Sequence, residues 1–176
     1  GSEMCIRDSY AAGAAFAMSQ KISALSLGDA ALKKIGIRKG LPETEDQALV
    51  YLFMASSSLS GDDYEKLLDD FIRQFPANAD GYLRRANYYA AKGKDDQTWY
   101  DKAVADFNQA LKVAQKKDDV YYNIGKLMYA YQLSKPEKTY KDWTYDTALQ
   151  NVRQAIAIDP LPIYIQMEGD ILLSLI

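Results

Sequence analysis

The chain has 176 residues, of which 48% are hydrophobic and 26% are charged, and its formal net charge is −3. This length and composition suit one globular core and exclude a disordered or fibrous chain. The Lys and Arg residues are interspersed with acids, so we expect no nucleic-acid partner. There is no His, and Cys5 is the only Cys, which excludes zinc sites, Cys/His catalysis and a disulfide framework. We expect neither a metal nor a cofactor.

The first nine residues are interpreted as non-native. Gly1-Ser2 resembles the scar left by removal of an affinity tag, and residues 3–9 resemble a translated adapter sequence joined to a gene. We therefore expect a single helical repeat domain over residues 10–176, truncated at its C-terminal end. The compartment stays open between the cytoplasm and the periplasm or cell envelope.

Residues 10–18 are short, apolar and rich in small side chains, and they have two interpretations. One is the core of a signal peptide with its cleavage site. The other, which we favour, is the first helix of a helical hairpin, because Gly13 and Phe16 lie three residues apart as Gly125 and Met128 do. The second helix of that hairpin would carry Ala24 and Ala31, seven residues apart. No apolar run reaches the ~18 residues that a membrane span needs.

A connection follows over residues 36–45, where two Gly and one Pro break the helical period. The next helix is expected to start at a cap formed by Thr44 or Asp46 and to end at the serines of 56–58. Its partner is expected over residues 63–75, with Pro76 as the stop.

Two longer hairpins are expected next, the first with helices over 79–92 and 96–116, the second with helices over 118–133 and 136–158. Their small residues recur where two helix backbones would approach each other: Ala86, Ala103 and Ala110 in the first, and Gly125, Ala148 and Ala155 in the second. We expect the extra residues before each second helix to lengthen that helix, because 11 residues make almost three turns.

The order of residue types in these hairpins is specific. Tyr121 is followed by Gly125 and then Met128, and the second helix carries alanines seven residues apart and ends before Pro160. This pattern resembles the tetratricopeptide repeat (TPR), although both repeats exceed the usual 34 residues. The resemblance implies a fragment of a longer bacterial TPR protein, folded as an all-α, right-handed α-solenoid of about four hairpins plus one unpaired C-terminal helix. It also implies a scaffold that binds a protein or peptide in its concave groove, without catalysis.

The same resemblance implies which residues line the groove. They are Leu83, Arg84 and Asn87 in one repeat, and Tyr122, Asn123 and Lys126 in the next. Two cations and two amides on adjacent repeats resemble in residue type the clamp with which some TPR proteins hold a terminal carboxylate, though the clamp's full set is not matched. The alternative is an ordinary solvated face.

Trp99 and Trp143 each stand shortly before the first small residue of a second helix. They are expected to cap the core at the longest hairpin ends, or alternatively to form a rim platform that binds carbohydrate. The paired aspartates, such as Asp118-Asp119, are assigned to helix starts, where the dipole stabilises them by about 0.3–1 kcal/mol, rather than to catalysis.

Residues 161–176 repeat the first-helix spacing once more, through Ile165, Gly169 and Leu172. No partner helix follows, and the last turn is apolar, whereas solenoid ends need a polar capping face. We expect this surface to be covered by further repeats or by a second copy of the chain.

Overall fold

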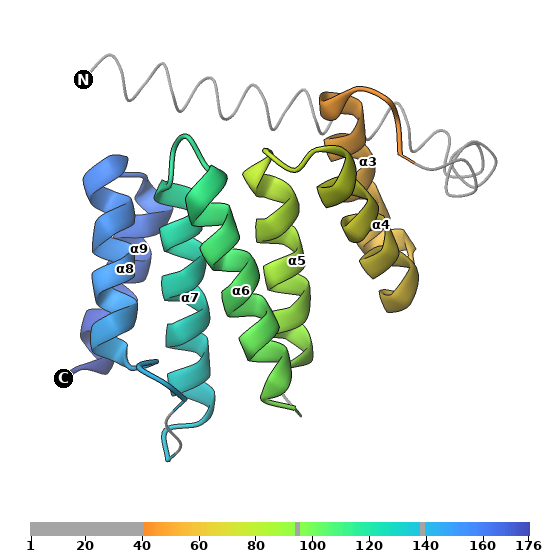
Figure 1. The fold of residues 1–176 in the computed structure, drawn as a ribbon. Coiled ribbons are helices and arrows are strands. Elements are labelled where there is room, and N and C mark those ends of the chain that lie inside the picture. Colours follow the sequence, from red (N-terminus) through yellow and green to blue (C-terminus); the bar gives the residue numbers. More distant parts are fainter. Residues whose placement is uncertain (1–40, 94–95, 138–139) are drawn as a thin grey trace. The chain divides into compact units, whose positions relative to one another are not determined.

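The structure is a computed structural model that describes residues 41–93, 96–137 and 140–176 (Figure 1). Within these ranges it has seven α-helices and no strand, so the described chain is all-α. No helix in these ranges is long and apolar enough to cross a membrane. The chain divides into two compact units between Phe75 and Pro76. The predictions for residues 1–40, including Gly13, Ala24 and Ala31, lie outside the described residues.

The first unit contains α3 (Glu45–Ser58) and α4 (Gly61–Gln74). The Thr44 hydroxyl caps α3 by accepting a hydrogen bond from the Gln47 backbone N–H, as expected from the sequence. Ser60 caps α4 in the same way. Pro76 follows shortly after α4 ends, where its ring and missing N–H prevent another turn.

The second unit contains five helices: α5 (Ala79–Lys92), α6 (Thr98–Val113), α7 (Asp118–Ser134), α8 (Tyr145–Ile158) and α9 (Pro162–Ser174). α5 packs mainly on α6 and α7 mainly on α8, which gives two hairpins, and α9 packs on α8 (Figure 1). The Arg85 side chain of α5 holds Asp106 of α6 through two hydrogen bonds of 2.8 Å each.

The small residues of these hairpins lie in the interior. Ala86, Ala103, Ala110, Ala148 and Ala155 have no exposed surface. A Cβ atom on Gly125 would lie 2.8 Å from Val152 Cγ2 and 2.9 Å from the Ala148 carbonyl oxygen. The backbones of α7 and α8 therefore approach each other too closely at this point for any larger residue.

The prediction that the extra residues lengthen the second helix is wrong for α8. This helix begins at Tyr145 instead of near residue 136, because Thr144 has extended backbone angles and forms a capping box with Thr147. The described residues before it, 135–137 and 140–144, are not helical, and Tyr140 and Trp143 among them lie in the core.

That core is strongly aromatic. Trp143 packs against Tyr140, Tyr100 and Tyr131 with ring centroids 4.7, 5.2 and 5.5 Å apart, all near edge-to-face. Such pairs contribute roughly 0.5–1.5 kcal/mol each beyond the area they bury. Trp143 is only 3% exposed, so it is a core residue, as the first of its two interpretations had it.

Candidate functional site

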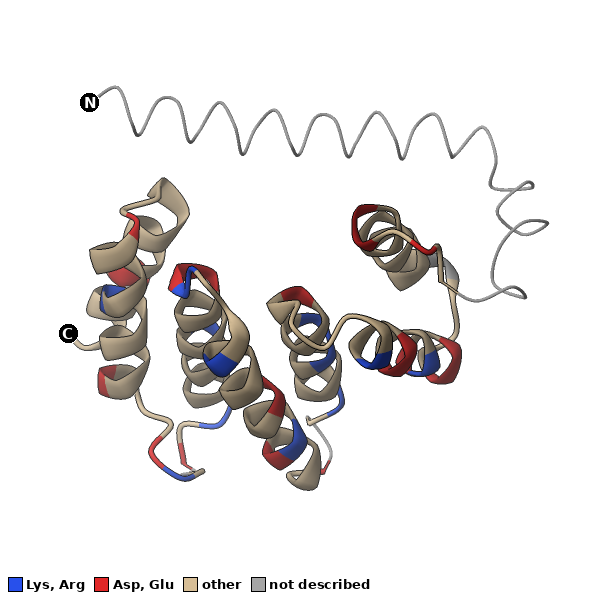
Figure 2. Ribbon diagram, turned by 45° about the horizontal axis from the view of Figure 1, so that its top comes forward, with Lys and Arg blue, Asp and Glu red and all other residues tan. Residues whose placement is uncertain are grey.

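The residues predicted to line a groove meet where α5 and α7 lie side by side. The Asn87 amide donates a 3.1 Å hydrogen bond to the Asn123 side-chain oxygen, so the two amides are in direct contact. Asn87 and Lys126 are exposed, and Arg84 is partly exposed. Figure 2 shows acidic and basic positions interspersed along the described helices.

Three of the predicted groove residues are buried, which corrects their placement on an open surface. Leu83 is 7% exposed, and Tyr122 and Asn123 are each 8% exposed. The Tyr122 ring packs on Tyr164 of α9 with centroids 4.8 Å apart, because α9 covers this side of α7. The surface that remains open consists of Arg84, Asn87 and Lys126, with Asp119 beside it.

Asn123 has a structural role. Its amide nitrogen donates to the backbone oxygen of Asp119 at 2.8 Å and to the Asp119 carboxylate at 3.0 Å, while its oxygen accepts from Asn87. Both N–H groups and the carbonyl of this amide are therefore used within the protein. Asn123 fixes the position of Asn87, and the side chains of Asn87 and Lys126 are exposed to solvent.

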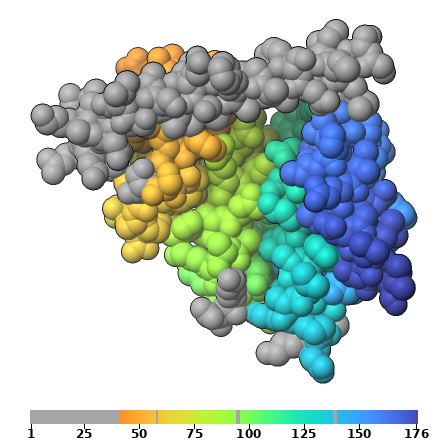
Figure 3. All heavy atoms as spheres, turned by 180° about the vertical axis from the view of Figure 1, so that it is seen from behind, coloured from red at the N-terminus to blue at the C-terminus, as the bar shows by residue number. Residues whose placement is uncertain are grey.

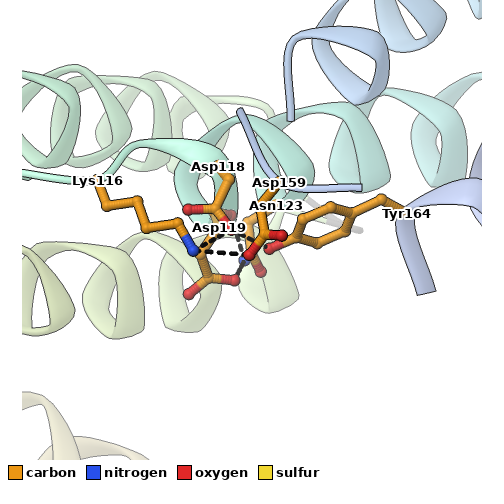
Figure 4. A network of polar contacts seen from close by, with 6 residues as sticks. All are labelled: Lys116, Asp118, Asp119, Asn123, Asp159 and Tyr164. Atoms are coloured by element: carbon orange, nitrogen blue, oxygen red, sulfur yellow. Dashed lines mark hydrogen bonds and ion pairs between the residues drawn. The ribbon is translucent and has the colours of Figure 1, made fainter. Parts of the chain in front are cut away.

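A polar network joins the start of α7 to the end of α8 and to α9 (Figure 4). The Lys116 ammonium lies 2.7 Å from an Asp159 carboxylate oxygen and 3.7 Å from one of Asp118. The Tyr164 hydroxyl donates to Asp118 at 2.8 Å. Asp118 and Asp159 are buried, so the network satisfies two carboxylates that would otherwise be costly to remove from water.

Burial, followed by the hydrogen bond to Asp118, raises the pKa of Tyr164 far above its ordinary value, so this hydroxyl stays protonated and keeps donating. Burial also raises the pKa of Asp119, and the nearby carboxylates of Asp80 and Asp118 raise it further. The hydrogen bond from Asn123 and the charge of Lys126 lower this pKa, but they do not cancel the rise.

Asp119 is an exposed residue, so we expect its ionised carboxylate to reduce stability at neutral pH only modestly. Folding raises the pKa of this carboxyl above its ordinary value of 3.8, so the protonated form stabilises the fold. That stabilisation is fully present below pH 3.8 and is lost as pH rises through the folded pKa. We expect Asp119→Asn to raise the free energy of unfolding at pH 7, with the gain shrinking as pH falls toward 4. Urea unfolding over this pH range measures the effect. The same substitution at Asp170 of α9, away from Asp80 and Asp118, is the control, and a gain for Asp119→Asn that does not change with pH would contradict the assignment.

The two Trp residues do not form a shared platform. Trp143 is buried, and the Trp99 ring is approached by the ammonium groups of Lys102 and Lys92, at 4.4 and 4.6 Å from its centroid. Burial therefore removes Trp143 from the predicted rim platform, whereas Trp99 is partly exposed and its role there stays a prediction.

The described ranges contain no group of three or more His, Cys, Asp or Glu residues arranged to hold a metal ion. Comparisons with protein-family models, curated proteins and solved structures found no match for this chain.

Proposed function

We propose that the protein is a binding module of the TPR kind, which holds a peptide or protein segment against the surface formed by α5 and α7. The repeated hairpins α5–α6 and α7–α8 support this proposal, because their first helices, α5 and α7, are in contact. The role needs no catalytic group and no cofactor.

The observation that carries the proposal is the contact between Asn87 and Asn123. Since Asn123 is fully used, it fixes one N–H of the exposed Asn87 amide, whose carbonyl oxygen and second N–H have no hydrogen-bond partner among the described residues. An amide held in this way can bond a peptide backbone of any sequence. It gives affinity without selecting a side chain.

Lys126 supplies the charge for such a site. Its exposed ammonium lies 5.7 Å from the Tyr122 ring centroid, and no carboxylate of the described residues is within ion-pair distance of it. A charge-assisted hydrogen bond from Lys126 to a carboxylate is about twice as strong as a neutral one. We infer that the ligand is a segment with an acidic C-terminus, whose backbone contacts Asn87 and whose carboxylate contacts Lys126.

Peptides ending in acidic residues test this function, each made with a free and with an amidated C-terminus. Fluorescence anisotropy should show tighter binding of the free acid, and Lys126→Ala should weaken that binding roughly 10- to 100-fold, since hydrogen bonds to charged groups contribute about 1.5–3 kcal/mol. Lys112→Ala, which removes an exposed Lys from α6, is the matched control. Equal binding of the free-acid and amidated peptides, or no binding of either, would contradict the proposed site.

A carbohydrate-binding role has no comparable support. Its proposed aromatic surface depends on Trp143, which lies in the core, and on Trp99, whose ring is approached by two lysines.

A further inference from the structure

One side of α9 is apolar and exposed. Its exposed fractions are 49% at Ile165, 39% at Leu172 and 70% at Leu173, and Gly169 lies among them. At 100° per residue these four residues form one stripe, here named the α9 face. Figure 3 shows the end of α9, in the darkest blue, at the molecular surface.

The other side of α9 is packed. Ile171 has no exposed surface and Tyr164 is 3% exposed. The Ser174 hydroxyl is hydrogen bonded to Tyr129 of α7 at 3.1 Å. The helix is therefore anchored through one side and presents the α9 face on the other.

The structure contains an occupied version of this face on α7. Tyr121, Gly125, Met128 and Tyr129 stand at the same spacing as Ile165, Gly169, Leu172 and Leu173, and α8 covers them. Tyr129 packs against Tyr145 with ring centroids 5.8 Å apart, near the start of α8.

The close approach at the centre of that pairing depends on Gly125. An added Cβ there would lie 2.8 Å from Val152 Cγ2, whereas an added Cβ on Gly169 would meet nothing within 4 Å. The α9 face thus has the shape that receives an antiparallel helix on α7, and no helix of the described residues occupies it.

The charges on α9 favour one kind of helix over another as the occupant of the α9 face. α9 contains Glu168 and Asp170 and no Lys or Arg. Glu168 is paired with Arg153 at 2.9 Å, which leaves Asp170 beside the face. Two copies of α9 packed antiparallel would bring their Asp170 carboxylates to the same edge, which is unfavourable, whereas a helix with basic flanks complements them.

We propose that the α9 face docks an amphipathic helix of a partner protein, antiparallel to α9, with a small residue opposite Gly169 and basic flanking residues. The pattern it must carry is the one α8 presents to α7: Tyr145, then small Ala148 three residues later, then β-branched Val152 four further on. This docking surface is separate from the one that binds acidic peptides.

A stapled helical peptide with the sequence of residues 144–159, carrying Asp146→Lys, is the probe, because position 146 and the native Arg153 lie at one edge of its docking face. The staple fixes the helix, so a failure to bind is informative. Fluorescence anisotropy should show saturable binding to the full chain, at least tenfold weaker for Gly169→Leu. That substitution enters open space in the free protein, so its melting temperature should not fall.

Ile163→Ala is the control, because it removes an exposed apolar side chain of α9 that lies outside the face. It should leave probe binding unchanged. Absence of probe binding, or equal binding by wild type and Gly169→Leu, overturns the proposal. A wild-type dimer in sedimentation that Gly169→Leu converts to monomer also overturns it, because a second copy would then be the occupant. Since Lys126→Ala should not affect the probe, this test is independent of the acidic-peptide site.

Discussion

Replacing Gly125 with Leu should lower the free energy of unfolding by about 1–3 kcal/mol or more, as overpacking of a close helix contact does. The first added carbon would already lie 2.9 Å from the Ala148 carbonyl oxygen, which belongs to the backbone and cannot rotate away. The α7–α8 hairpin must therefore separate or α8 must shift. Urea unfolding followed by circular dichroism measures the loss.

Gly125→Ala is the graded comparison. It introduces only the Cβ atom and should be destabilising by a smaller amount, even though Ala favours helices over Gly by about 0.8–1.0 kcal/mol. Unchanged or increased stability for both substitutions would show that α7 and α8 are farther apart than the structure places them.

Replacing Arg85 with Met should cost about 3 kcal/mol. Arg85 holds Asp106 through two 2.8 Å hydrogen bonds, and the Asp106 side chain is only 8% exposed. Removing one partner of a buried pair leaves an uncompensated charge and typically costs about 3–5 kcal/mol. We expect the lower end of this range because the Arg85 side chain is 22% exposed.

Arg153→Met is the matched control, because the Arg153 side chain is 55% exposed and its pair with Glu168 should contribute about 0–1 kcal/mol. Arg85→Met combined with Asp106→Leu should recover part of the loss, since no buried charge is then left unpaired. An equal effect of Arg85→Met and Arg153→Met in urea unfolding would show that the Arg85 pair is not buried in solution.

The all-α class and several helix ends could be predicted from the sequence because local signals determine them. Thr44 supplies a cap hydroxyl, Pro76 prevents another turn, and the alternation of small and large residues indicates the helix faces. The start of α8 was missed because Thr144 and Thr147 form a capping box without the usual acidic or amide residue.

The polar network could not be predicted from local patterns. Lys116 and Asp159 are 43 residues apart, and Tyr164 reaches Asp118 over 46 residues. Asp118 stands at a helix start, where a sequence pattern assigns it to solvent. Only the packing of α9 onto the start of α7 buries it, and nothing near Asp118 in the sequence signals that contact.

The candidate binding surface was predicted in part. The family resemblance implied that these two amides lie side by side, and Asn87 does contact Asn123. The family pattern did not anticipate that Tyr122 would pack on Tyr164, because this contact depends on a third helix. The exposed part of the site therefore contains only three of the six predicted residues, Arg84, Asn87 and Lys126.

α7 and α9 present the same helix-packing face, which α8 covers on α7 and which no described helix covers on α9. Urea unfolding of wild type, Gly125→Leu and Gly169→Leu under one condition tests it most directly. The account predicts a loss of about 1–3 kcal/mol or more for Gly125→Leu and no loss for Gly169→Leu, whose side chain enters open space. A comparable loss in both variants, or none in Gly125→Leu, would contradict it.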